Sequence, residues 1–159
     1  MRFDVQACND VRIYLVYTTT SADYTFYEII IDTDGTSIIR NLNGHVYIMS
    51  LEKNKYCLDC TRYTFFTISW ERDLLLTGQC AGDVILVPAA NDILVEDVYV
   101  MTGSGSSGHW IVYRNGMYLM TGSGSSGHWI VYRNGMYLMT GSGSSGHWIV
   151  YRNGMYLMK

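Results

Sequence analysis

The fold of this chain is decided by the stretch YVMTGSGSSGHWIVYR, residues Tyr99–Arg114. Apolar and aromatic residues flank a run of glycines and serines, a pattern that predicts a strand, a loop over Gly103–Gly108 and a second strand. The loop satisfies the GxGxxG fingerprint, but that fingerprint binds a phosphate only where the loop opens a helix. Here the residues after the loop favour a strand, so we do not expect a nucleotide site.

The core of this stretch occurs three times without a difference. The 19 residues Thr102–Met120 recur as Thr121–Met139 and Thr140–Met158. The first copy follows Tyr-Val-Met and the later copies follow Tyr-Leu-Met, so we assign residues 1–120 to one domain and residues 121–158 to two duplicates. Identical copies indicate a recent duplication, an assembly error or engineering, and the sequence leaves these origins open.

The duplicates are expected to form β-hairpins rather than new domains. The two hairpins are predicted at His128–Met139 and His147–Met158, where neither strand face is fully polar. Unpaired strands of this kind allow self-association. We therefore expect a chain truncated after Arg114 or Met120 to be at least as soluble as the full chain.

Composition narrows the class of protein. The chain has 159 residues, 48% hydrophobic and 16% charged, which is typical of one packed domain rather than a disordered segment. Its net charge of −3, without a cluster of Lys or Arg, argues against a nucleic-acid partner. No run of 18 or more apolar residues follows the start, so we expect no signal peptide and no membrane partner, and the cytoplasm by default.

Alternation of apolar and polar residues is the main local signal along the chain. It predicts short strands over residues 2–7, 11–17, 24–31, 37–40, 45–51, 64–70, 74–77, 83–87 and 93–101, with turn residues between them. No segment has a sustained helical period. Many short strands at this spacing are typical of an antiparallel sandwich or barrel.

Cys8, Cys57, Cys60 and Cys80 raise the question of a metal or redox site. The spacing of Cys57 and Cys60 resembles half of a zinc site, and four thiolates would complete one. The remaining two cysteines lie far apart, and no βαβ pattern supports a redox motif, so we expect no metal site. Cys8 is interpreted as a small buried hydrophobic residue.

No catalytic constellation is recognisable. His109 has no paired nucleophile and is interpreted as a strand histidine. The 14 tyrosines and 4 tryptophans either fill β-strands or present rings able to stack on a sugar, and both interpretations stay open.

Several segments in order resemble the farnesoic acid O-methyltransferase-like domain family. They are Phe3–Asp10, Tyr27–Ile30, Ser37–Arg40, Phe66–Trp70, Tyr99–Gly103 and Gly108–Trp110. The resemblance covers residues 1 to about 113 and, with the strand pattern, predicts an all-β, jelly-roll-like antiparallel β-sandwich. Family members have sequence before the first strand, so we expect this chain to be truncated at its N-terminus, which would open a sheet edge.

The resemblance implies two functions. One is a non-catalytic binding module for a glycan or a protein, without a cofactor. The alternative, implied by the family name, is S-adenosylmethionine-dependent methylation of farnesoic acid to methyl farnesoate, a precursor of juvenile hormone. For the module we expect the loops at one end of the sandwich to form the ligand site, with Asp34, Arg40, Ser104, His109 and Trp110 as candidate ligand-binding residues.

Overall fold

A computed structural model of the chain describes residues 1–18, 24–32, 35–53, 58–70, 73–78, 85–88, 95–114, 117–133, 140–143, 148–152 and 155–158. The regular structure of these residues is β-strand throughout, without a helix. A helix long and apolar enough to span a membrane is accordingly absent from the described segments.

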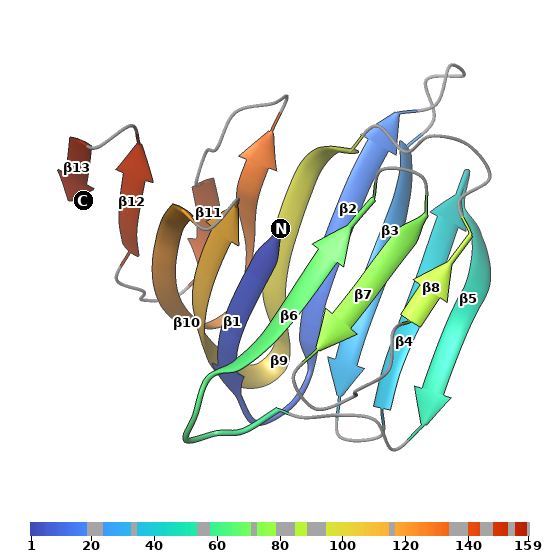
Figure 1. Cartoon of the computed structure of the whole chain (residues 1–159), viewed down its shortest axis with the longest axis horizontal. Helices are drawn as coiled ribbons and strands as arrows, with labels where there is room; N and C mark the ends of the chain where they lie inside the picture. The colour runs from blue at the N-terminus through green and yellow to red at the C-terminus, as the bar shows by residue number, and fades with distance from the viewer. Residues whose placement is uncertain are drawn as a thin grey trace.

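The strands form two antiparallel sheets of five strands, ordered β5-β4-β3-β2-β9 and β9-β1-β6-β7-β8, so that β9 belongs to both. In Figure 1, β6, β7 and β8 lie in front of β2 to β5. This two-layer arrangement is consistent with a β-sandwich and confirms the predicted all-β antiparallel class. The strands are β1 (Arg2–Ala7), β2 (Val11–Thr18), β3 (Tyr24–Asp32), β4 (Gly35–Leu42), β5 (His45–Lys53), β6 (Thr64–Ser69), β7 (Leu74–Gly78), β8 (Ile85–Val87) and β9 (Val95–Arg114).

On most strands the alternation of apolar and polar residues in the sequence corresponds to a buried and an exposed face. On β2, Val11, Ile13, Leu15 and Tyr17 are buried while the residues between them are partly exposed. Burial also alternates along β3, β6, β7, β8 and the described side chains of β9, whereas the described side chains of β5 are exposed or only partly buried. The buried side chains of both sheets meet in one core. Its other buried apolar members are Phe3, Val5, Ala7, Tyr27, Ile29, Ile31, Ile38, Leu58, Phe66, Ile68, Leu74, Leu76, Ile85, Val87, Val95, Val98, Val100, Trp110 and Val112.

The predicted loop at Gly103–Gly108 is wrong. These residues belong to β9, a single strand of 20 residues that bends and passes from one sheet to the other (Figure 1). Before the bend β9 pairs with β2, up to Val11 opposite Thr102. After it β9 pairs with β1, starting with Ala7 opposite Gly108. The run of glycines and serines therefore forms a corner between the sheets, as glycines in strands often do.

Gly108 packs closely against neighbouring residues in this corner. A Cβ atom added to it would lie 2.9 Å from Thr102 Cγ2 and 3.4 Å from both Ala7 Cβ and Trp110 Nε1. Thr102 and Ala7 are themselves buried, with exposed fractions of 3% and 2%. Only a residue without a side chain leaves β9 room to turn here, so Gly108 is required by close approach rather than by its φ angle.

β10 (Met117–Arg133) runs beside β9 along almost its whole length. Their register extends from Met117 opposite Arg114 to Arg133 opposite Asp97. β10 begins in the first copy of the repeat and continues through residue 120 into the second, so it crosses the position where we placed the domain boundary.

Three shorter strands follow: β11 (Thr140–Gly143), β12 (Trp148–Arg152) and β13 (Met155–Met158). Within the expected hairpin His147–Met158, β12 pairs with β13 in antiparallel register. Within the expected hairpin His128–Met139, the residues up to Ile130 pair with β11 instead, and residues 134–139 lie outside the described part of the chain.

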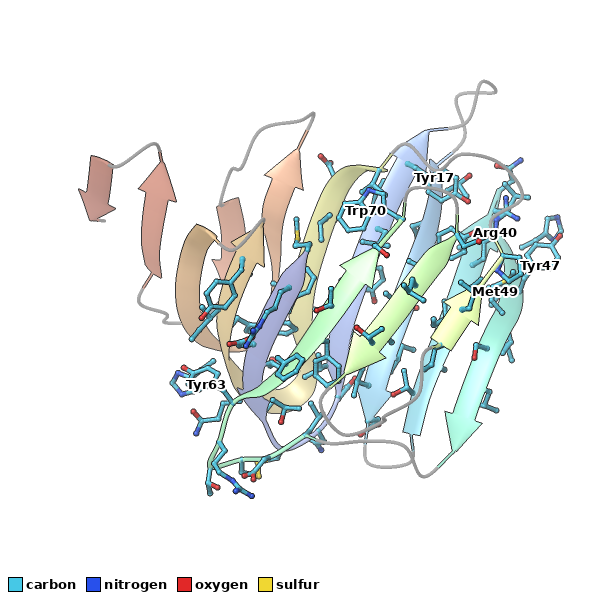
Figure 2. The ribbon with its side chains drawn as sticks, in the orientation of Figure 1. Tyr17, Arg40, Tyr47, Met49, Tyr63 and Trp70 are labelled. Atoms are coloured by element: carbon cyan, nitrogen blue, oxygen red, sulfur yellow. A yellow bond between two sulfur atoms is a disulfide. The ribbon has the colours of Figure 1, made fainter. Side chains whose placement is uncertain are left out.

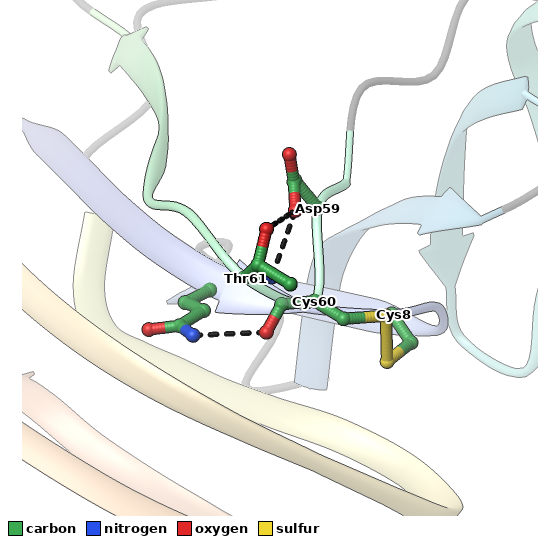
Figure 3. Close-up of a disulfide and its surroundings, with 5 residues drawn as sticks. Cys8, Asp59, Cys60 and Thr61 are labelled. Atoms are coloured by element: carbon green, nitrogen blue, oxygen red, sulfur yellow. Dashed lines mark hydrogen bonds between the residues drawn. A yellow bond between two sulfur atoms is a disulfide. The ribbon is translucent and has the colours of Figure 1, made fainter.

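Cys8 forms a disulfide with Cys60, which corrects its interpretation as a buried hydrophobic residue (Figure 3). Cys8 is exposed, in the turn after β1. Cys60 is held in reach by local hydrogen bonds: Asp59 Oδ1 accepts from the Thr61 backbone N–H and hydroxyl, each at 2.7 Å, and the Gln6 amide donates to the Cys60 carbonyl at 2.9 Å. Cys57 and Cys80 lie outside the described residues.

The same hydrogen bonds act on the Asp59 carboxylate. Donation by the Thr61 hydroxyl, helped by the Thr61 backbone N–H and by Arg62, holds the pKa of Asp59 well below its usual range. The carboxylate thus stays ionised and keeps this turn in place at any ordinary pH.

We predict that Gly108→Ala lowers the free energy of unfolding by about 1–3 kcal/mol, because the new methyl group overpacks the corner. Adding Thr102→Ser removes the methyl group at 2.9 Å and should recover part of the loss. Urea unfolding of the two variants and the parent measures this. A Gly108→Ala protein as stable as the parent would contradict the close packing.

We predict that breaking the disulfide destabilises the domain. The bridge closes a segment with a sequence separation of 52, for which loop entropy gives about 4 kcal/mol. The double variant Cys8→Ala, Cys60→Ala should show this loss in thermal unfolding, and dithiothreitol should reproduce it in the parent. An unchanged melting temperature in both the double variant and the reduced parent would contradict this prediction.

The structure reverses the expectation for truncation, because β10 covers the outer edge of β9. A chain ending at Arg114 leaves the 20 residues of β9 unpaired on that side, whereas a chain ending at Arg133 keeps β10. Size-exclusion chromatography should find more association or precipitation for the first chain than for the second, in which β9 is paired on both sides and the open edge is that of the shorter β10. Two equally soluble monomers would show that β10 is dispensable.

Candidate functional site

The structure describes four of the five predicted ligand-binding residues and does not bring these four together. Arg40 lies on β4 and is labelled at the upper end of the sandwich in Figure 2, while Ser104 lies in the bend of β9, where β1 ends and β2 begins. His109 is exposed on β9 opposite Gln6, and Asp34 lies outside the described residues.

Trp110 is not available to a ligand. It is 2% exposed and packs edge-on against Phe3 in the core, with ring centroids 6.4 Å apart. Its indole thus stabilises the sheet that β9 enters after the bend. Of the predicted set, Arg40 and His109 remain as accessible side chains, and they lie on different sheets.

A better candidate lies on the outer face of the sheet formed by β2, β3 and the first half of β9. Here a shallow depression of about 280 Å³ is lined by Tyr14, Val16, Phe26, Tyr99 and Met101, and we call it the outer-face depression. Strand pairing builds it directly, since Tyr14 lies opposite Tyr99 on one side and Val16 lies opposite Phe26 on the other. The lining is almost wholly apolar, and three of its side chains are aromatic.

The aromatic rings are held in fixed orientations. The Tyr14 and Phe26 rings contact each other with centroids 5.7 Å apart. The Tyr14 hydroxyl donates to Glu28 Oε1 at 2.6 Å, and the Tyr99 hydroxyl donates to Asp97 Oδ2 at 3.2 Å. Each phenol is therefore anchored at its polar tip while its ring lines the depression.

Charged groups border the depression. Arg12 pairs with Asp10 at 2.7 Å and with Glu28 at 3.1 Å, and its hydrogen bond to Asp10 raises the pKa of the guanidinium. Burial, together with the bond to Glu28, raises the pKa of Tyr14 to about 12. Tyr14 hence remains a protonated donor in neutral solution, which fixes the direction of its hydrogen bond to Glu28.

This arrangement is suited to binding a small molecule. It offers apolar and aromatic surface with carboxylates at its border, which is the usual composition of a small-molecule site. Among the described residues, no group of three or more His, Cys, Asp or Glu is placed to hold a metal ion.

Sequence reasoning missed this depression, although its signal is present in the sequence. Tyr14 and Val16 on β2, and Tyr99 and Met101 on β9, occupy the positions between buried residues. Polar residues are expected at such positions on a half-exposed sheet. The signal is therefore the apolar residues at the outward positions of β2 and β9. The sequence alone does not show that these two strands are neighbours, because they lie far apart in the chain.

Comparison with known proteins identifies no relative: no family model, no curated protein and no solved structure matches the chain.

Proposed function

We propose that this protein is a non-catalytic β-sandwich binding module that takes a carbohydrate in the outer-face depression. The observation that carries the proposal is the set of anchored rings of Tyr14, Phe26 and Tyr99 on one exposed sheet face. Such rings do not contribute to the core, and a soluble domain has no structural need to gather them on its outer face.

The chemistry of a sugar matches both parts of the depression. One face of a pyranose ring presents C–H bonds, which pack on the electron-rich face of an aromatic ring. Its hydroxyls need acceptors, which Glu28 and Asp97 provide at the border. Rings already fixed by hydrogen bonds lose little further freedom when a ligand binds, so the site is preorganised.

The alternative of an S-adenosylmethionine-dependent O-methyltransferase has less support. That activity needs a glycine loop leading into a helix around the cofactor. Gly103–Gly108 lie inside β9, and the described part of the chain offers no helix. Calorimetry with S-adenosylmethionine tests the alternative, and micromolar binding would favour it over the binding module.

We propose that the chain is a divergent member of the farnesoic acid O-methyltransferase-like domain family, with a jelly-roll-like sandwich. In support, the segments that resemble the family form β1, β3, β4, β6 and β9, and one strand wraps from sheet to sheet. The Cys8–Cys60 disulfide supports an oxidising, extracellular setting for such a module rather than the cytoplasm.

The test is a glycan array followed by saturation-transfer NMR with the best glycan. The single variants Tyr14→Ala, Phe26→Ala and Tyr99→Ala should each weaken binding roughly three- to tenfold, the value of one aromatic contact. Tyr47→Ala is the matched control, because Tyr47 is 48% exposed on β5, away from the depression, and should leave affinity unchanged.

Two outcomes would count against the carbohydrate. An array without a positive glycan would do so, as would a glycan whose affinity is unaffected by all three variants. Capture of a defined protein that competes for Tyr14 and Phe26 would instead assign the depression to a protein ligand.

A further inference from the structure

A second feature lies on the opposite face of the same sheet, at one end of the sandwich. Arg40 on β4 pairs with Tyr27 on β3, which is 1% exposed, so the backbone directs Arg40 to the inner face. Figure 2 shows Arg40, Tyr17 and Trp70 at the same end of the molecule, with Tyr47 and Met49 of β5 beside Arg40. Arg40 is only partly buried, so part of its side chain is accessible to solvent.

The guanidinium of Arg40 is fixed on one side by two tyrosines. Its Nε donates to the Tyr17 hydroxyl at 3.1 Å, and its Cζ lies 5.9 Å from the centre of the Tyr27 ring. The rings of Tyr17 and Tyr27 are stacked, with centroids 5.6 Å apart. The hydrogen bond to Tyr17 uses Nε, and among the described residues the two terminal nitrogens of Arg40 have no hydrogen-bond partner.

Arg40 differs from the other arginines whose side chains the structure describes. Those three each pair with a carboxylate: Arg2 with Asp4 at 2.6 Å, Arg12 with Asp10 at 2.7 Å, and Arg62 with Asp59 at 2.9 Å. Among the described residues Arg40 has no carboxylate partner. A positive charge next to the apolar core is costly unless something balances it.

Thr25 supplies an independent observation in the same layer. It is 0% exposed, lies opposite Tyr17 in the β2–β3 pairing, and its Oγ1 has no hydrogen-bond partner among the described residues. Buried hydroxyls are normally paired. This end of the inner face therefore holds polar groups whose hydrogen-bonding capacity exceeds what the neighbouring residues use.

We propose that Arg40 is a carboxylate-binding site at this end of the sandwich, separate from the outer-face depression and independent of the function proposed for it. The terminal nitrogens of an arginine form a planar fork that matches the two oxygens of a carboxylate. Tyr17 and Tyr27 act as positioning residues, because they orient the fork without occupying its terminal donors. The ligand is a small organic acid or the acid group of a uronic sugar, which share this chemistry.

The proposal is tested by two-dimensional NMR of arginine side-chain N–H groups at pH 7, where carboxylates are ionised. Acetate, glucuronate and glucose are titrated in parallel. Acetate and glucuronate should shift the Arg40 signals, and glucose should not. Equal shifts by acetate and glucuronate identify the carboxylate as the recognised group, whereas a clearly tighter glucuronate adds recognition of the sugar.

Substitutions at Arg40 separate the contribution of the planar guanidinium to binding from the contribution of its positive charge. Arg40→Gln should weaken the binding of the preferred acid at least about tenfold, and Arg40→Lys should restore only a small part of it, because lysine lacks the planar fork. Tyr17→Phe should weaken binding less, since it frees Nε but keeps the guanidinium. Arg62→Gln is the matched control, because the Arg62 side chain is 84% exposed and already pairs with Asp59.

Three results would overturn the proposal: no shift of Arg40 with either acid, equal shifts with glucose, or full affinity in Arg40→Lys. If Arg40→Gln fails to fold, the acid affinities of the Arg40→Lys and Tyr17→Phe proteins test the proposal instead, since both variants keep a side chain of similar size.

Discussion

The close approach of Gly108 to Thr102 and Ala7 is the constraint on which the rest of this structure depends. β9 enters the corner paired with β2 and leaves it paired with β1, so the backbone of one strand belongs to both layers of the sandwich. A side chain at position 108 would collide with Thr102 at 2.9 Å, and the turn between layers could not be this tight. Because β9 joins the layers, every other strand is placed relative to it.

The candidate sites follow from this placement. The first half of β9 completes the sheet on which Tyr14, Phe26 and Tyr99 come together, although Tyr99 is far from the other two in the sequence. On the inner face of the same sheet, Tyr17 and Tyr27 contact Arg40 near one end of the strands. One five-stranded sheet thus presents an aromatic surface on its outside and a cation at its end.

Local strand structure was predictable from the sequence, because a half-buried strand leaves a period of two that needs no tertiary information. β1 to β8 all coincide with predicted segments for this reason. The bend in β9 was not predictable in the same way, since a run of glycine and serine is equally compatible with a loop and with a strand that turns a corner. Only the pairing with β1 and β2 distinguishes the two.

The functional residues were harder to predict, because after the bend both faces of β9 carry apolar or aromatic residues and the sequence does not reveal which face lies in the core. Trp110 was predicted to bind a ligand and lies in the core. Arg40 was predicted to bind a ligand too, and it is partly exposed but lies away from the other described candidates. The pairing of Cys8 with Cys60 was missed because the spacing of Cys57 and Cys60 suggested a local pair, while the contact that matters spans 52 residues.

The most direct test of the central claim is a nuclear Overhauser experiment on the backbone of β9. A continuous strand that changes sheets predicts cross-strand contacts from Thr102 to Val11 and from Gly108 to Ala7 in the same molecule, with slowly exchanging amides between them. Rapid exchange across Gly103–Ser107 without these paired contacts would show that the segment is a loop, and would contradict this account of how the two sheets are joined.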